Sequence, residues 1–173
     1  MDHYFHNQDF AILPVDFATM FDDYPLLNGR GYPDTVNPGP IYNSEGVPSQ
    51  QVSSLITAKK GQRILIRYSN VSETEFITLT VPGIPMTIIA KDGRILKGMS
   101  IKPNDSGNFV ASGPSTFTRT TSYTIGGGES VDFILDTTNT QPGTYFLYGA
   151  RLQELSNDQE DYGGLMTHIV ITP

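Results

Sequence analysis

The chain has 173 residues, enough for one domain with a sizeable core and too few for two domains of ordinary size. Its formal net charge of −7 argues against a nucleic-acid partner, because phosphate backbones bind to basic surfaces. The absence of Cys rules out disulfides, thiolate metal sites and thiol nucleophiles, and no apolar stretch approaches the roughly 20 residues that membrane insertion of a helix requires.

The N-terminal segment contains the chain's weak candidates for metal ligands. His3 and His6 are spaced as His-x-x-His and are flanked by Asp2 and Asp9. A free amine at Met1 would add the amine-x-His pattern that wraps Cu(II) or Ni(II) in a square plane. Terminal segments are often poorly ordered, however, so we expect any metal bound here to be adventitious. No physiological metal site is expected in this chain.

The first third of the chain predicts one strand and then a long connection. Residues 10–15 are apolar and end near Pro14, which is typical of a short or edge strand. Residues 18–48 show no sustained period and are rich in Gly, Pro, Asn and Asp; the glycines of the Gly29-Arg30-Gly31 run would allow sharp turns. A loop of this length is normally functional, packed on itself or docked on a partner.

The middle of the chain predicts short strands at regular spacing. The clearest is at residues 63–68, where Ile64, Ile66 and Tyr68 would share one face and the intervening residues would face solvent. Further strands are expected at residues 51–58, 75–81 and 86–90, and the Asp92-Gly93 pair signals a tight turn.

The last third predicts two antiparallel hairpins. Residues 118–125 are expected to pair with residues 129–136 across a bulged turn at Gly126-Gly127-Gly128, because a strand follows the glycines where a phosphate cradle would need a helix. Residues 143–148 and 165–172 would supply the last two strands, with a helical turn in the acidic segment 154–161. The whole pattern predicts an all-β Greek-key sandwich or barrel of seven to nine mainly antiparallel strands.

The polar residues offer little for catalysis. The chain has three His and no Ser-His-Asp order or obvious pair of carboxyls for acid–base work. His168 has no second ligand at metal spacing and is expected to be a structural or surface residue. Residues 158–161 could form a cation-collecting rim, but a solvated loop is the favoured interpretation. We therefore predict no catalytic residue in this chain and no cofactor bound to it.

Four stretches of the sequence are informative when taken together in their order. They are Gly61-Gln-Arg-Ile-Leu-Ile-Arg-Tyr-Ser-Asn70, Thr80-Val-Pro-Gly-Ile-Pro-Met-Thr-Ile-Ile-Ala-Lys-Asp-Gly93, Tyr123-Thr-Ile-Gly-Gly-Gly-Glu129 and Pro142-Gly-Thr-Tyr-Phe-Leu-Tyr148. In this order they resemble the cupredoxin-like domains of multicopper oxidases, the family of laccases, cuprous oxidases and bilirubin oxidases. A fifth stretch, residues 24–34, is similar to the loop that opens a middle domain in bacterial members.

The departures from the family pattern concern the copper ligands. Copper-bearing domains carry His-x-His pairs, or a His-Cys-His run followed by another His and a Met. Here the equivalent hairpin reads Phe146-Leu147-Tyr148, and Ile84 stands where relatives often have His. Met166 falls near the axial Met position but lacks the Cys and His that would accompany it. The resemblance thus implies the copper-free middle domain of a three-domain enzyme, and a start at Met1 without an export signal is typical of an excised fragment.

By resemblance, the parent enzyme would oxidise a small substrate at one copper and reduce dioxygen to water at a trinuclear cluster, both in flanking domains. This domain would serve as scaffold and as part of the substrate cleft, in an exported (periplasmic or extracellular) protein. Residues 18–48 and 154–161 are expected to contact the flanking domains. Apolar surface would then be exposed in the isolated chain and could drive self-association, through Phe17, Phe21, Tyr24 or Tyr32.

A different class of function remains open. A stand-alone β-sandwich that binds a sugar or a partner protein would also explain the aromatic residues in predicted loops. These residues are Tyr24, Tyr32, Tyr42 and Tyr162.

Overall fold

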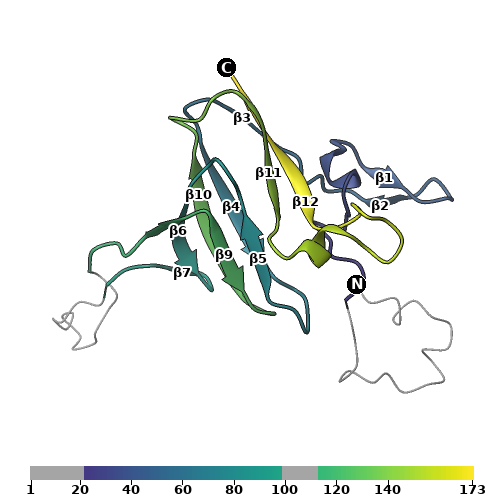
Figure 1. Ribbon diagram of the computed structural model, residues 1–173, viewed down its shortest axis with the longest axis horizontal. Helices are drawn as coiled ribbons and strands as arrows, with labels where there is room; N and C mark the ends of the chain where they lie inside the picture. Colours follow the sequence, from purple (N-terminus) through teal and green to yellow (C-terminus); the bar gives the residue numbers. More distant parts are fainter. Residues whose placement is uncertain (1–21, 99–112) are drawn as a thin grey trace.

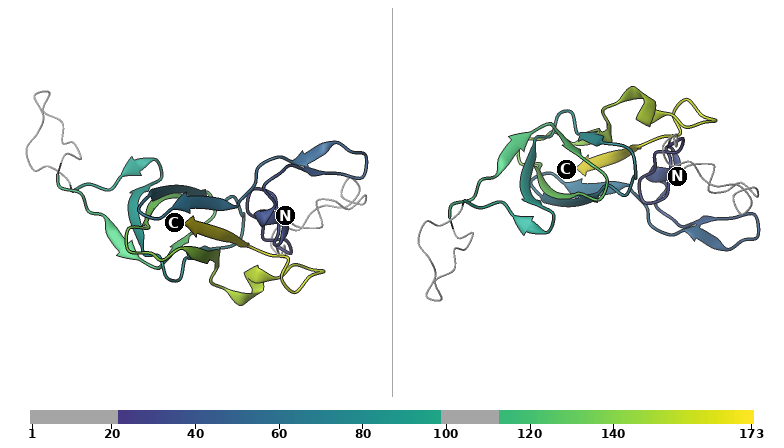
Figure 2. Two further views of the ribbon diagram at one scale, coloured as in Figure 1. Left: turned by 90° about the horizontal axis from the view of Figure 1, so that it is seen from above. Right: turned by 90° about the horizontal axis from the view of Figure 1, so that it is seen from below.

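Two five-stranded sheets pack face to face in the computed structural model, which describes residues 22–98 and 113–173 (Figure 1). The predicted all-β sandwich is confirmed. A separate two-stranded arm projects from one side of the sandwich (Figure 2). The arm consists of β1 (Ile41–Tyr42) and β2 (Pro48–Gln50), preceded by the short 3-10 helix η3 (Asp34–Val36).

The first sheet has the order β4-β10-β6-β7, and β8 also pairs with β6. The second has the order β3-β12-β11-β5-β9, in which β3 and β12 form a parallel pair and the other neighbours are antiparallel. The strands of the first sheet are β4 (Arg63–Ser69), β6 (Met86–Lys91), β7 (Arg94–Ile95), β8 (Thr118–Thr120) and β10 (Ser130–Asp136); those of the second are β3 (Ile56–Lys59), β5 (Ile77–Thr80), β9 (Ser122–Ile125), β11 (Gly143–Gly149) and β12 (Met166–Thr172).

The core lies between the two sheets, and the predicted alternation of the strands fills it. In β4, Ile64, Ile66 and Tyr68 pack against the core, whereas Leu65 is 53% exposed on the outer face. β10 alternates in the same way, with Phe133 and its inward neighbours almost fully buried. The buried apolar side chains of the core come from strands of both sheets and from adjoining connections: Leu79, Val81, Ile84, Met86, Ile88, Ile125, Val131, Phe133, Leu135, Leu147, Leu165, Ile169 and Ile171.

The predicted hairpin across Gly126-Gly127-Gly128 is wrong. The glycines instead carry the chain from β9 in one sheet to β10 in the other, because β9 pairs with β5 and β10 pairs with β4 and β6. The predicted strand 118–125 is also two strands, since β8 joins the first sheet and β9 the second.

Buried Asn70 holds this crossing in place. Its side-chain Nδ2 donates to the carbonyl oxygens of Glu75 (2.9 Å) and Ile125 (3.2 Å), and its own carbonyl accepts from the Gly128 amide at 2.9 Å. Gly127 lies so close to Ser72 that an added Cβ would be 2.3 Å from the Ser72 carbonyl oxygen. These contacts are distant in sequence, which explains why the local pattern suggested a simple turn.

The remaining predictions mostly hold. Strands occur within the predicted ranges 75–81 and 86–90, and Asp92 (φ 47°) and Gly93 (φ 74°) form the tight turn from β6 to β7. The strand predicted at residues 51–58 is shorter and appears as β3. The long loop is more ordered than expected, because it contains η3, β1 and β2. The strand predicted at residues 10–15 lies outside the described residues.

Candidate functional site

The two segments predicted to contact flanking domains lie beside each other at one side of the sandwich (Figure 2). The Tyr32 amide donates to the Gly164 carbonyl at 2.9 Å, which joins the long loop to the end of the acidic loop. Gly31 packs directly against the backbone of Gly163. The two loops therefore form one continuous surface, which we call the loop surface (residues 22–54 and 150–165).

Arg30 stabilises the arm by hydrogen bonds from its buried side chain. It is fully buried, at 0% exposure, and its guanidinium donates to four backbone carbonyls. Nη1 reaches the carbonyls of Asp34 (3.2 Å) and Asn37 (2.6 Å), and Nη2 reaches those of Gly39 (2.7 Å) and Gln50 (2.8 Å). A guanidinium offers five donors in a planar fork, which suits several carbonyls at once. The sequence pattern draws attention only to the neighbouring glycines, because the carbonyls that Arg30 binds come together only in the folded chain.

The base of the arm is tied to β12. The Thr35 hydroxyl, fully buried, donates to the Met166 carbonyl at 2.6 Å. The Thr167 hydroxyl donates to the Ser54 carbonyl at 3.0 Å, and the Ser54 hydroxyl in turn donates to the Leu27 carbonyl at 3.1 Å. These buried hydrogen bonds fix the long loop to the sandwich, so the arm projects from an anchored base.

His168 takes part in an aromatic contact on the outer face of the second sheet. Its ring stands edge-on to Phe146, with ring centroids 5.0 Å apart, and lies 5.6 Å from the ring of Tyr32. Its Nε2 is 3.5 Å from the Tyr32 hydroxyl oxygen, at the long limit for a hydrogen bond. This arrangement agrees with the structural role predicted for His168, and it further attaches the long loop to the sheet.

Exposed apolar side chains lie on the loop surface, at Leu152 and Tyr162, and on the connection between β4 and β5, at Val71 and Phe76. Val71 is 89% exposed, Leu152 82%, Tyr162 71% and Phe76 67%, values that are high for large apolar residues. The two groups are joined just beyond β11, where the Ala150 amide donates to the Thr78 carbonyl at 2.7 Å and Arg151 is paired with Glu75. The residues named in the prediction differ, because Tyr24 and Tyr32 are half-buried while Phe17 and Phe21 lie outside the described residues.

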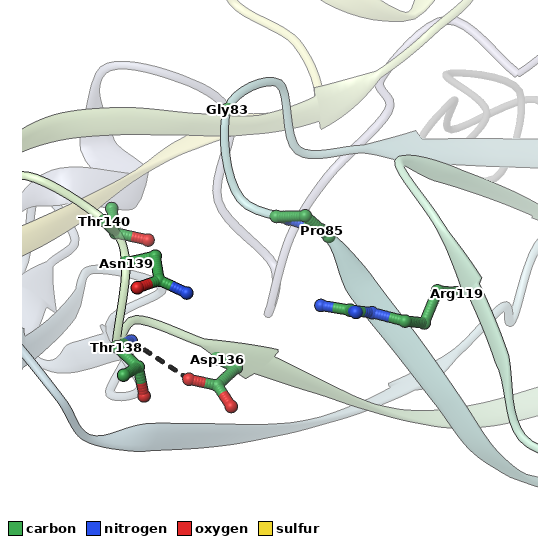
Figure 3. A pocket seen from close by; sticks show the side chains of 7 residues that line it. All are labelled: Gly83, Pro85, Arg119, Asp136, Thr138, Asn139 and Thr140. Carbon is green, nitrogen blue, oxygen red and sulfur yellow. Dashed lines mark hydrogen bonds between the residues drawn. The ribbon is translucent and has the colours of Figure 1, made fainter.

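A small hollow of about 280 Å³ lies at the other end of β11, on the side of the β10–β11 connection (Figure 3). In this view Arg119 reaches from β8 toward Asp136 and Asn139. Hydrogen bonds from Thr138 keep the pKa of Asp136 below its ordinary value, with a smaller contribution from Arg63 and Arg119. The lining is Gly83, Pro85, Arg119, Asp136, Thr138, Asn139 and Thr140.

This hollow is a weak ligand site on physical grounds. Ligand pockets are mostly apolar and larger than about 300 Å³, whereas this one is polar and shallow. Its lining includes no aromatic side chain on which a sugar ring could stack. The hollow therefore gives little support to the interpretation as a sugar-binding module.

No group of three or more His, Asp or Glu side chains is placed to hold a metal ion within residues 22–98 and 113–173. The candidates His3 and His6 lie outside these ranges. In the acidic loop the Asn157 side-chain oxygen accepts hydrogen bonds from the amides of Gln159 and Glu160, both at 2.8 Å, while the carboxylates of residues 158–161 stay exposed. In the same described part of the chain no helix has the length and apolarity to span a membrane.

No protein-family model matches the sequence, and no curated protein matches it. Solved structures do match. A blue copper oxidase from Nitrosomonas europaea superimposes with a TM-score of 0.62 at 22% identity over 88% of this chain. A multicopper oxidase, mgLAC, superimposes with a TM-score of 0.53 at 18% identity over 69% of this chain. A variant laccase from B. aclada superimposes with a TM-score of 0.50 at 14% identity over 74% of this chain. The chain has the fold of a multicopper-oxidase domain.

This domain corresponds to a minor part of each of those proteins. It spans 36% of the length of the Nitrosomonas protein, 32% of mgLAC and 20% of the laccase. The chain therefore covers about a third of the length of the first two proteins that it matches.

The structure shows where the sequence positions that the resemblance relates to copper ligands lie, namely Ile84, the residues 146–148 and Met166. Ile84 is fully buried in the apolar core, and Leu147 is 3% exposed there. Tyr148 and Met166 are paired across β11 and β12, so Met166 takes part in a regular sheet ladder. Side chains at these positions contribute packing.

Proposed function

We propose that this chain is a copper-free cupredoxin-like domain from the middle of a multicopper oxidase. In the parent protein it would hold the two flanking domains in register and form part of the substrate cleft. The likeness to about a third of the length of known multicopper oxidases carries the proposal.

The chemistry of the sequence supports a structural role. A blue-copper site needs a Cys thiolate and two imidazoles, and the chain has no Cys and three His. The parent would therefore carry its coppers in the flanking domains, where a small substrate is oxidised and dioxygen is reduced to water. Export of the parent follows from the same family resemblance.

The loop surface supports contact with a neighbouring domain. It combines an arm anchored by Arg30, a loop joined to it through Gly164, and exposed apolar side chains at Leu152 and Tyr162. Exposed apolar residues at the edge of an anchored surface are typical of a site that another protein surface covers. We infer that a flanking domain packs here.

The reading frame on either side of the coding sequence tests this proposal. We expect it to continue on both sides and to encode His-x-His segments and a His-Cys-His segment followed by His and Met. A frame that encodes no further cupredoxin-like domain would favour the stand-alone binding module. In that case, screening the purified chain against glycans and against proteins of its source would identify the ligand.

A further inference from the structure

Glu154 is a buried carboxyl group at the root of the acidic loop. It belongs to the 3-10 helix η4 (Leu152–Leu155), and its side chain is 7% exposed. The carboxyl group lies against the backbone of Gly149, where an added Cβ would be 2.3 Å from Oε2. Only a glycine at position 149 leaves room for it.

Among the described residues this carboxyl group has no hydrogen-bond partner, and its ion pair with Arg151 is long and shared with Glu75. In the described part of the chain neither Oε1 nor Oε2 accepts a hydrogen bond, and the Tyr68 hydroxyl is buried and unpartnered as well. The nearest cation is Arg151, whose Nη1 lies 3.9 Å from Oε1 but is paired with the Glu75 carboxylate. A buried carboxylate without hydrogen bonds is costly, whereas a neutral carboxyl in the same place costs much less.

We propose that Glu154 is a pH-sensitive latch on the acidic loop. The neutral carboxyl stays beside Gly149 and holds η4 against the sandwich. The ionised carboxylate turns outward toward Arg151, whose side chain is 41% exposed, and loosens the loop.

The charged and titratable groups around Glu154 come from three segments. Tyr68 lies on β4, Glu75 precedes β5, and Arg151 follows β11. Burial is the main cause that raises the pKa of Glu154; the charge of Arg151 acts in the opposite direction, and the charge of Glu75 adds to the effect of burial. Burial and the Glu154 charge also raise the pKa of Tyr68, which therefore stays neutral.

The backbone of Glu154 explains why the loop would follow its side chain. Its carbonyl accepts from the Leu165 amide at 2.6 Å, and the neighbouring Leu155 carbonyl accepts from the Gly164 amide at 3.1 Å. The Gly164 carbonyl in turn accepts from the Tyr32 amide of the long loop. Movement of η4 would therefore disturb both halves of the loop surface. The latch would be a property of this chain alone and does not depend on the proposed parent enzyme.

Hydrogen exchange of the complete chain tests the latch. Amide exchange in residues 150–165 would be measured between about pH 5 and about pH 8 and corrected for the intrinsic pH dependence of exchange. We expect wild-type protection in this segment to fall severalfold across the range, because ionisation of Glu154 would loosen η4 and the loop that follows it. Glu154→Gln should keep its protection at every pH, and Glu160→Gln, an exposed control in the same loop, should behave like wild type. An equal fall in Glu154→Gln and wild type, or a flat wild type, overturns the proposal.

Carboxyl NMR of the wild-type chain provides a second measurement that does not depend on the folding of Glu154→Gln. The Glu154 carbon should titrate above its ordinary value of 4.5, together with the amide shifts of residues 150–165. Glu75→Gln removes a like charge and frees Arg151, so the titration should move to lower pH. Titration of Glu154 at or below 4.5, or without any change in the loop amides, contradicts the latch.

Discussion

Gly31 and Gly163 touch backbone to backbone: a Cβ added to Gly31 would lie 2.1 Å from the carbonyl oxygen of Gly163. These two glycines lie in the long loop and the acidic loop, which are more than a hundred residues apart in the sequence. A side chain at Gly31 would force the loops apart, whereas one at Gly163 would collide with Asn157 and Glu160 of its own loop. The loop surface therefore depends on glycine at this contact.

Gly31→Ala should separate the two loops and destabilise the chain. The new methyl group has only backbone to displace, and overpacking of this kind typically costs about 1–3 kcal/mol. Gly39→Ala is the matched control, because its Cβ would find its nearest neighbour at 3.7 Å, in ordinary contact. Urea unfolding of both variants measures the difference. Equal stability of the two would show that the contact at Gly31 yields without cost.

Arg30→Lys should release the arm while leaving the sandwich folded. A lysine carries its three donors on a single nitrogen, so it cannot reach the four carbonyls that Arg30 binds from two separate nitrogens. Hydrogen bonds to charged groups contribute about 1.5–3 kcal/mol each, so the loss should exceed about 2 kcal/mol. Faster hydrogen exchange of the amides in residues 38–50 would measure this loss of stability in the arm.

The control for this variant is Arg67→Lys on β4, where the side chain is 77% exposed in a surface ion pair with Asp132. Such pairs contribute about 0–1 kcal/mol, so little change is expected. Protection of residues 38–50 that is unaltered in Arg30→Lys would contradict the role assigned to Arg30.

Local patterns predicted the strands well and the connections poorly. The strand at residues 63–68 could be predicted because apolar and polar residues alternate within that segment of the sequence. The crossing at Gly126-Gly127-Gly128 depends on Asn70 and Ser72, about 55 residues earlier, so a hairpin and a crossing look alike locally. The arm was missed for the same reason, since the carbonyls around Arg30 come together only in the folded chain.

Leu135→Ala should be far more destabilising than Leu65→Ala. Leu135 on β10 is fully buried between the sheets, whereas Leu65 on β4 faces solvent at 53% exposure. Truncation of a buried leucine costs about 2–5 kcal/mol, and truncation of an exposed one costs a small fraction of that. Chemical denaturation of the two variants checks the register of the first sheet. Similar losses in both would mean that the inward face of these strands has been misassigned.

Glu154 should also give the chain a distinct dependence of stability on pH. Its pKa is higher in the folded chain than the ordinary 4.5, so the folded state binds the proton more tightly. This contribution to the free energy of unfolding is fully present below pH 4.5 and is lost as the pH rises through the raised value. Wild type should therefore lose stability relative to Glu154→Gln as the pH rises, in urea unfolding at a series of pH values.

Glu129 should affect the pH dependence of stability in the opposite direction to Glu154. Its hydrogen bond with Lys91 (2.8 Å), followed by that from the Gly126 amide, lowers the pKa of its exposed carboxylate. Its contribution to stability is present above the unfolded value and is lost as the pH falls through the folded one. Glu129→Gln should therefore differ from wild type mainly above the ordinary pKa of Glu. If both variants shift with the same sign, the assignment of Glu154 as a buried neutral carboxyl is wrong.

Copper loading tests the central claim most directly. The purified chain would be acetylated at its N-terminal amine, incubated with Cu(II), dialysed and assayed for copper by mass spectrometry and electron paramagnetic resonance. Acetylation removes the amine-x-His site that Met1 and His3 would otherwise form. A copper-free structural domain should hold well under one copper per chain after dialysis and should show no blue-copper signal. One tightly held copper per chain, surviving acetylation and dialysis, would contradict the account.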